Sequence, residues 1–361
     1  MKLTLQIKLL PDKNQSQSLL ETIKKCNSIC NEISNSAWER KTYNQYKLHH
    51  IVYHPIRKSS KIAAQALVRC ISKVVDSYKL DKKTKRFFRL LGAITYDDRI
   101  LSYNDKIASI WSVNGRLKIP FVCHNTNYLP HIKGEADLIV RGGKFYLFQT
   151  VEIPEDNVRD VEEFIGVDFG MVNLATTSND LSYSGKDVNR VMQRTTRIKS
   201  ILQKKNSKSA KKHLKKLSGT ERRFKRQTNH VISKRIVSLA KDTNKGIALE
   251  DLKGFKATVR REQREKFTKW AFNELGEFIT YKAKLAGVPV IFIDPRDTSK
   301  TCNKCGYISR NNRRSQSKFI CRQCGFSLNA DLNGAMNIAS RASVNKPIAV
   351  YVQSRTASHK N

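Results

Sequence analysis

The feature that most constrains what this 361-residue chain can fold into is a double Cys-x-x-Cys pattern. Fifteen residues separate the two pairs, whose members are Cys302, Cys305, Cys321 and Cys324. This spacing is typical of four thiolates that surround one Zn²⁺ tetrahedrally, and Gly306 and Gly325 allow the turn that follows each pair. The pattern predicts a zinc ribbon over residues 301–325, in preference to a disulfide or a redox pair.

A zinc ion with four thiolate ligands has no open position for a water molecule, so the predicted zinc is structural. Its binding energy would fix the ends of the loop between the two pairs. This loop carries four basic residues that are suited to phosphate contact: Arg310, Arg313, Arg314 and Lys318.

Charge indicates the class of partner. The chain has 68 Lys and Arg against 31 Asp and Glu, a formal net charge of +37. Such an excess repels itself unless a polyanion neutralises it, and nucleic acid is the natural polyanion. No apolar run approaches the roughly 18–20 residues that span a bilayer, and the first residues lack a signal-peptide pattern. We expect no membrane partner and a reducing, cytoplasmic setting.

The basic charge is concentrated in residues 186–245, which hold 20 Lys and Arg against three acidic residues at helical spacing. A solvated helix face is the ordinary explanation of a charge run, but this one-sided excess favours contact with a nucleic-acid backbone. The candidate contacts are Lys211, Lys212, Lys215, Lys216, Arg222 and Arg223, together with Arg313 and Arg314 of the ribbon loop.

The first part of the chain mixes helical and strand patterns. Apolar residues recur at steps of three and four over Gln15–Glu39 and Lys61–Leu80, which predicts two helices that pair as a hairpin. Cys26 and Cys30 lie in the first apolar stripe, and we interpret them as core residues rather than metal ligands. Residues 2–9 and runs within 92–151 indicate strands of a small β-barrel or meander that carries this hairpin as an insertion.

Three carboxylates occupy the ends of predicted elements. Asp168 and Glu250 each close an apolar, strand-like run, and Asp331 opens the last predicted helix. If the two strands are neighbours in one sheet and the helix packs over their edge, the carboxylates converge on a site suited to Mg²⁺ or Mn²⁺. Two such ions about 3.5–4 Å apart hold the attacking water and the leaving oxygen of a phosphodiester. The pattern therefore predicts phosphodiester hydrolysis.

Two alternatives stand beside this interpretation. A single Asp at a strand end more often makes a turn hydrogen bond than binds a metal. Asp294 is also a rival for the site, but Pro295 follows it and holds it extended, so we interpret it as a turn into the ribbon.

In this order, the motifs "GVDFG", "ALEDL", "TSKTCNKCG", "CRQCG" and "NADLNGAMNIA" resemble those of the TnpB (OrfB) proteins of bacterial and archaeal insertion sequences. Those proteins are RNA-guided DNA nucleases related to the compact type V CRISPR effectors. The resemblance implies an α/β fold with an RNase H-like RuvC nuclease domain (160–300 and 326–341) and the embedded zinc ribbon (301–325). It further implies a β-barrel-like wedge domain (1–10 and 92–155), an inserted helical recognition lobe (11–91) and a C-terminal tail (342–361).

The same resemblance implies functional roles. Asp168, Glu250 and Asp331 would be the catalytic triad that binds Mg²⁺ or Mn²⁺, although Asn329 and Ala330 depart from the Asp-Arg-Asp form of many relatives. The partners would be one guide RNA for each monomer and a double-stranded DNA target, read by base pairing beside a short motif that the wedge and the lobe recognise. The setting would be the prokaryotic cytoplasm, close to the nucleoid.

Two further functions remain open at this point. One is an RNA-guided DNA-binding repressor that no longer cuts, which the presence of all three acids disfavours. The other is a transposase that joins DNA ends, which the position of the ribbon before the third acid disfavours.

Overall fold

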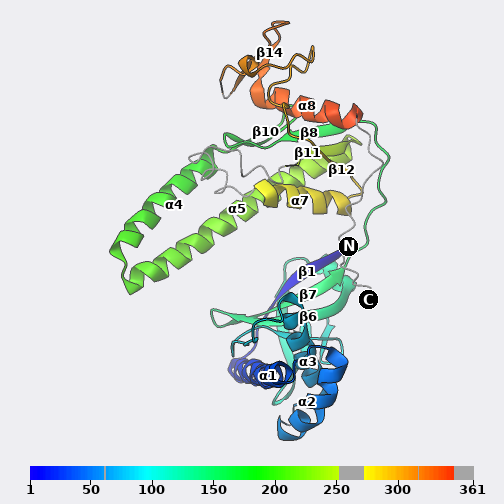
Figure 1. Ribbon diagram of the computed structural model, residues 1–361, viewed down its shortest axis with the longest axis vertical. Coiled ribbons are helices and arrows are strands. Elements are labelled where there is room, and N and C mark those ends of the chain that lie inside the picture. The colour runs from blue at the N-terminus through cyan, green and yellow to red at the C-terminus, as the bar shows by residue number, and fades with distance from the viewer. Residues whose placement is uncertain (61, 252–271, 316, 345–361) are drawn as a thin grey trace. The chain divides into compact units, whose positions relative to one another are not determined.

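The structure is a computed structural model that describes residues 1–60, 62–251, 272–315 and 317–344 (Figure 1). The chain divides into two compact units, Met1–Pro154 and Glu155–Asn361. No described helix combines the length and the apolar character that crossing a bilayer requires.

The first unit contains an antiparallel sheet in the order β2-β6-β7-β1-β5-β4-β3. Its strands are β1 (Lys2–Leu9), β2 (Ile94–Tyr96), β3 (Leu101–Asn104), β4 (Ile107–Ser112), β5 (Gly115–Cys123), β6 (Ile132–Arg141) and β7 (Lys144–Glu152), and the 3-10 helix η1 (Thr126–His131) precedes β6. The Tyr96 hydroxyl on edge strand β2 donates to the carbonyl of Trp111 on β4, at 3.0 Å. Tyr103 on edge strand β3 donates to Gln149 on β7, at 2.9 Å. The two edges are thus drawn together, and the sheet is nearly closed.

Three helices, not two, are inserted between β1 and β2. The two predicted helices exist and pack against each other, but a third lies between them in the chain, so they do not form the predicted hairpin of consecutive helices. The three helices are α1 (Lys13–Glu39), α2 (Gln45–Ser60) and α3 (Ala64–Leu80). The additional helix α2 buries residues spaced four apart, namely Leu48, Val52 and Ile56, but it contains Pro55, which normally ends a helix. Cys26 and Cys30 are buried in the core, as predicted.

The second unit is built on a five-stranded sheet in the order β10-β9-β8-β11-β12. The strands are β8 (Phe164–Asp168), β9 (Asn173–Thr177), β10 (Ser182–Ser184), β11 (Gly246–Glu250) and β12 (Val290–Ile293). β8, β11 and β12 are parallel, whereas β9 and β10 run antiparallel to their neighbours.

Helices cover both faces of this sheet (Figure 1). On one face, Ile165 and Val167 of β8 share a core with α5 (Lys208–Asp242) and α7 (Phe272–Leu285). On the other face, α8 (Ala330–Val344) packs Ile338 and Ala342 against Ala248 of β11. The predicted last helix therefore continues three residues beyond Arg341, into the predicted tail. The rest of that tail, 345–361, lies outside the described residues.

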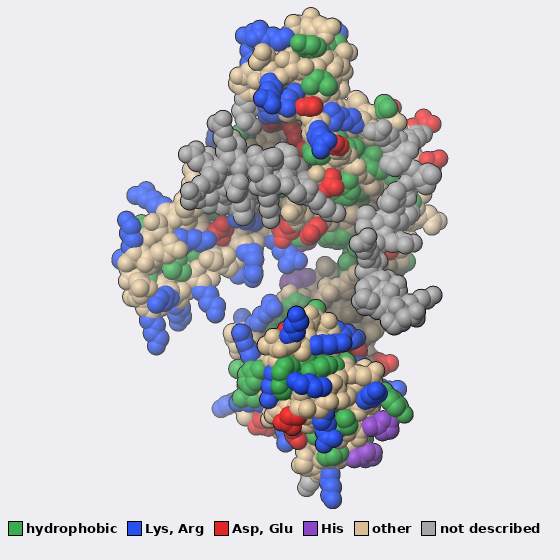
Figure 2. Space-filling view, in the orientation of Figure 1, with side chains coloured by type: hydrophobic (Ala, Val, Ile, Leu, Met, Phe, Trp, Pro, Cys, Tyr) green, Lys and Arg blue, Asp and Glu red, His purple; other side chains and the backbone are tan. Residues whose placement is uncertain are grey.

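The basic segment forms a long helical hairpin of α4 (Lys186–Lys205) and α5. Asn206, with a left-handed φ of 45°, ends α4, and the Ser207 side chain caps α5. The second half of α5 packs under the sheet, whereas the first half buries little besides Ala210. Figure 2 shows Lys and Arg side chains projecting along this hairpin.

Candidate active site and metal centre

The strand register sets two of the three predicted carboxylates side by side. Leu249 of β11 pairs with Val167 of β8 in a parallel ladder, so Glu250 and Asp168 follow at equivalent positions on adjacent strands. Alternation along the strands turns Ile165, Val167, Ile247 and Leu249 toward the α5–α7 face. Asp168 and Glu250 therefore lie at the C-terminal ends of two parallel strands on the opposite face, which α8 covers.

The third carboxylate is supplied by the first turn of α8. The Asn329 side chain caps this helix by accepting hydrogen bonds from the backbone N–H groups of Asp331 (2.9 Å) and Leu332 (3.2 Å). Asp331 is only 7% exposed. One helical turn further on, a Cβ added to Gly334 would lie 3.0 Å from an Asp168 carboxylate oxygen, so α8 passes directly over Asp168.

The charges of the three groups act on one another. Burial raises the pKa of Asp168 well above its usual range, and the carboxylates of Glu250 and Asp331 raise it further, while Arg313 opposes the shift. Burial also raises the pKa of Glu250, against the hydrogen bond from Thr298 and the charge of Arg341. This is the electrostatic pattern of a buried acidic pocket that lacks sufficient positive charge.

Neighbouring polar groups hold two of the carboxylates in place. Asn173 of β9 donates to one oxygen of Asp331 at 3.0 Å, and the guanidinium of Arg313 donates to the other at 3.2 Å. Thr298 donates to Glu250 at 2.6 Å. Each acid therefore keeps a defined orientation, which a metal ligand requires.

The donor set fits a hard divalent cation such as Mg²⁺ or Mn²⁺, since it consists of carboxylate oxygens. Among the described residues, the three carboxylates do not form a group whose ligand atoms all lie within 4.8 Å of one another. Mg²⁺ binds oxygen at about 2.1 Å, so two ligands of one ion are at most about 4.2 Å apart.

The four predicted ribbon cysteines do form a compact group, with every sulfur within 4.8 Å of the others. Cys302 and Cys324 have their sulfurs 3.8 Å apart, and those of Cys305 and Cys321 are 3.5 Å apart. A tetrahedron with Zn–S bonds of about 2.3 Å has edges of about 3.8 Å. The sulfur–sulfur distances of the group therefore suit a metal ion such as zinc.

The local backbone explains this geometry. Gly306 and Gly325 both have positive φ, at 77° and 69°, as the turn after each Cys-x-x-Cys pair requires. The strands β13 (Lys318–Ile320) and β14 (Ser327–Asn329) pair beside the second turn, and Phe319 is fully buried there. β14 leads directly into α8, so the ribbon fixes the start of the helix that carries Asp331.

The remaining predicted residues lie at some distance from this pocket or at its rim. Asp294 follows β12 with its side chain 62% exposed, and it accepts a hydrogen bond from the backbone of Arg296, which is the turn role expected of it. Arg314 is exposed on the ribbon. The six candidate residues of α5, from Lys211 to Arg223, are also exposed, and within the described part of the chain none pairs with a carboxylate.

Sequence reasoning missed the polar groups that hold the acids. Arg313 was predicted only as a phosphate contact. It directly follows the 3-10 helix η3 (Arg310–Asn312), and its side chain pairs with Asp331. Asn173 and Thr298 carried no signal, because their roles depend on contacts across 158 and 48 residues.

Comparison with known proteins gives two family matches. Residues 148–258 match a family described as "Probable transposase" (OrfB_IS605). Residues 272–338 match a family described as "Cas12f1-like, TNB domain". The first match includes Asp168 and Glu250, and the second includes Asp331 and all four ribbon cysteines.

Several curated proteins are similar to this chain. The CRISPR-associated endodeoxyribonuclease Cas12f1 of Sulfoacidibacillus thermotolerans is 33% identical over 218 residues, which are 55% of this chain and 50% of the relative. A TnpB-like protein of Methanocaldococcus jannaschii is 28% identical over 69% of this chain and 87% of the relative. InsQ of Escherichia coli (strain K12), provisionally named an RNA-guided DNA endonuclease, is 27% identical over 54% and 53%.

The chain thus spans half of the length of the Cas12f1 relative. The likeness lies where the sequence motifs predicted it, and over these residues the chain is similar to TnpB-like proteins and to Cas12f1.

Proposed function

We propose that this protein is an RNA-guided DNA endonuclease that hydrolyses phosphodiester bonds of a target DNA and is encoded by a transposable element. The observation that carries this proposal is the juxtaposition of Asp168 and Glu250 at the ends of β8 and β11 with Asp331 on α8. The names of the TnpB-like, Cas12f1 and InsQ relatives support the same activity.

In this proposal, the second unit is an RNase H-like RuvC nuclease domain with an embedded zinc ribbon. The nearly closed sheet of the first unit is a wedge domain, and α1, α2 and α3 form its recognition lobe. The mixed sheet supports the nuclease assignment: β9 and β10 continue it antiparallel on one side of β8, and β11 and β12 continue it parallel on the other.

Asp168, Glu250 and Asp331 would hold the catalytic Mg²⁺ or Mn²⁺, and the four ribbon thiols would hold a structural Zn²⁺. A divalent cation held there would supply an activated water and would stabilise the charge of the leaving oxygen. The protein's own groups keep Asp331 and Glu250 oriented through Asn173, Arg313 and Thr298. Arg313 also lowers the pKa of Asp168, so it favours the ionised form of that acid.

The exposed basic half of α5 would contact the backbone of the guide RNA and its DNA heteroduplex. Its exposed lysines and arginines form a long positive surface, and contacts of this kind with a nucleic-acid backbone do not depend on base sequence. Base pairing by the RNA would supply the sequence specificity, and one chain would act on one RNA.

Purification from cells that carry the native locus, followed by sequencing of the bound RNA, tests the guided activity. We expect one defined RNA to copurify and cleavage of matching duplex DNA to require both this RNA and Mg²⁺. Cleavage that proceeds equally well without RNA would refute the guided mechanism. Binding of matched DNA without cleavage by the wild type would identify a repressor instead.

Asp168→Ala tests the site itself. The variant should bind RNA and target DNA as the wild type does but lose cleavage, because the site loses the one acid that interacts with both Glu250 and Asp331. Asp294→Ala is the matched control, since it removes an exposed acid at the end of the adjacent parallel strand and should leave cleavage unchanged. An active Asp168→Ala variant would remove this residue from the catalytic site.

A further inference from the structure

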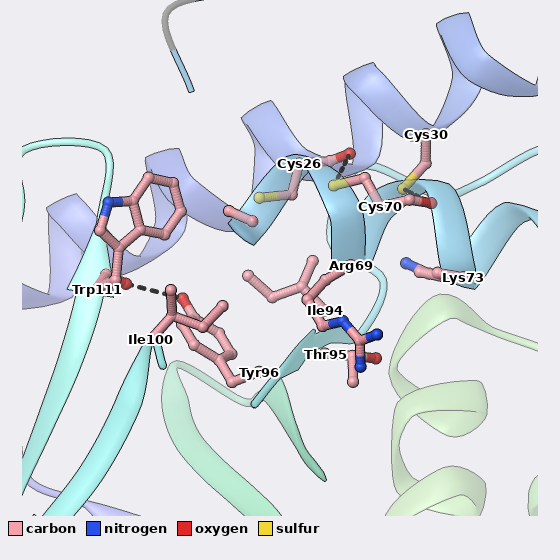
Figure 3. A pocket seen from close by; sticks show the side chains of 11 residues that line it. Cys26, Cys30, Arg69, Cys70, Lys73, Ile94, Thr95, Tyr96, Ile100 and Trp111 are labelled. Atoms are coloured by element: carbon pink, nitrogen blue, oxygen red, sulfur yellow. Dashed lines mark hydrogen bonds between the residues drawn. The ribbon is translucent and has the colours of Figure 1, made fainter. Parts of the chain in front are cut away.

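Three cysteines outside the ribbon meet in the core of the first unit. Cys26 and Cys30 lie on consecutive turns of α1, and Cys70 faces them from α3. All three are at most 5% exposed. Figure 3 shows the sulfur of Cys70 between those of Cys26 and Cys30.

The contacts show how closely the two helices approach here. The Cys70 thiol points to the carbonyl of Cys26 at 3.7 Å, and the Cys30 thiol points to the carbonyl of Cys70 at 3.9 Å. Each sulfur therefore reaches the main chain of the opposite helix. Small side chains at these positions let α1 and α3 approach each other closely.

The thiols differ chemically. The hydrogen bond from Cys70 lowers the pKa of Cys30 against the effect of burial, and the ammonium group of Lys73 lowers it further. Lys73 is held in position by Asn27 at 2.7 Å and by the carbonyl of Ala93. By contrast, the pKa of Cys70 is raised by the hydrogen bonds of this thiol with the other two cysteines and by burial. Cys30 is thus the better nucleophile of the two.

A narrow cavity lies beside the thiols. The three cysteines line it together with Tyr96 and Trp111, and its volume of about 10 Å³ is close to what one water-sized molecule needs (Figure 3). Hydrogen peroxide is little larger than water, whereas glutathione disulfide is far too large for this space.

We propose that Cys30 and Cys70 form a reversible disulfide that ties α1 to α3 when the protein meets hydrogen peroxide. The Cys30 thiolate attacks one peroxide oxygen, the O–O bond breaks, and the released hydroxide takes up a proton to leave as water. Cys70 then attacks the sulfur of the Cys30 sulfenic acid, the S–O bond breaks, and the oxygen leaves as a second water with the Cys70 proton. Two thiols lose two electrons and two protons, and one peroxide becomes two waters.

The pairing is specific. Cys26 and Cys30 share one helix, where residues four apart keep their main chains at a fixed separation, so a bond between them would distort α1. Cys70 lies on another helix, so a bond to it links α1 with α3. Of its two neighbours, Cys30 is the one whose own thiol reaches Cys70, at 3.9 Å from its carbonyl oxygen, and the bond is assigned to it for that reason.

The test uses the full zinc-loaded chain and does not depend on nuclease activity. The protein is treated with hydrogen peroxide at neutral pH, free thiols are blocked with N-ethylmaleimide, and the unreduced chain is digested with trypsin. Cleavage after Lys25, Arg40, Arg69 and Lys73 releases residues 26–40 and 70–73. We expect mass spectrometry to find these two peptides linked, and dithiothreitol to separate them.

Variants and fragmentation then identify the bond. Cys26→Ser should keep the linked peptide, and Cys30→Ser should lose it. Fragmentation of the linked wild-type peptide should place the bond on Cys30, and this measurement does not depend on how well a variant folds. The proposal is overturned if the ribbon thiols oxidise but peptides 26–40 and 70–73 remain unlinked. A bond to Cys26, or a yield no higher than in the urea-unfolded chain, would overturn it equally.

Discussion

Gly166→Ala should lower both the stability of the second unit and the activity of its pocket. Gly166 lies on β8 beneath α8, two residues before Asp168. A Cβ at this position would lie 2.0 Å from the carbonyl oxygen of Ala335 and 2.5 Å from the backbone nitrogen of Ala339. Both atoms belong to the main chain of α8, so no change of side-chain rotamer can relieve the overlap.

The size of the effect follows from the distance. Ordinary contacts begin at 3.4 Å, so the helix must retreat by 3.4 minus 2.0, about 1.4 Å, from the sheet. Overpacking typically costs about 1–3 kcal/mol, and we expect the upper end of this range because backbone must move. The same displacement carries Asp331 away from Asp168, and a misplacement of about 1 Å can cost about 100-fold in rate.

Urea unfolding, followed by circular dichroism with a separate probe for each unit, checks the first effect, and cleavage assays at a temperature where the variant is folded check the second. Gly219→Ala is the control, because its Cβ would meet only the mobile end of Arg223 at 3.4 Å within α5. That change should be neutral or stabilise by up to about 1 kcal/mol. A Gly166→Ala variant as stable and as active as the wild type would refute the close packing of α8 on β8.

The other predictions concern charge and metal. Arg313→Ala should shift the pH–rate profile for cleavage to higher pH, because this arginine lowers the pKa of Asp168, whereas the exposed Arg310→Ala should not. In magnesium-free buffer, Asp168→Asn should be more stable than the wild type, by an amount that grows as pH rises through the raised pKa of Asp168. The sign follows because the folded wild type binds more protons than the unfolded chain in that pH window. Melting temperatures at pH 5–8 measure the stability difference, at roughly 2–4 °C per kcal/mol. An advantage of the variant that shrank with rising pH would contradict the prediction. Cys321→Ser should lower the zinc content and the melting temperature, whereas Cys123→Ser, outside the ribbon, should leave both unchanged, as metal analysis and thermal melts would report.

The local patterns of the sequence were sufficient for most elements, because periodicity reports which face of an element is buried. The strands that end in Asp168 and Glu250 and the helix that begins beside Asp331 lie where their patterns predicted them. No helix was predicted at α2, which contains the helix-breaking residue Pro55 although its apolar residues have ordinary helical spacing. There, tertiary packing of Leu48, Val52 and Ile56 outweighs the local cost of proline.

The sequence by itself determined the residue types of the two candidate metal sites, the basic charge and the family relationship. Ligand spacing predicted the thiol group, because both Cys-x-x-Cys turns are local structures stabilised by their own glycines. Only the tertiary structure decided which groups surround the acids. Asp168 and Glu250 are 82 residues apart and meet through a parallel ladder, and Arg313 reaches Asp331 only because the ribbon folds back on α8. The pairing of α1 with α3 at Cys30 and Cys70 was likewise beyond the sequence, since periodicity identifies a buried face but not the element that it faces.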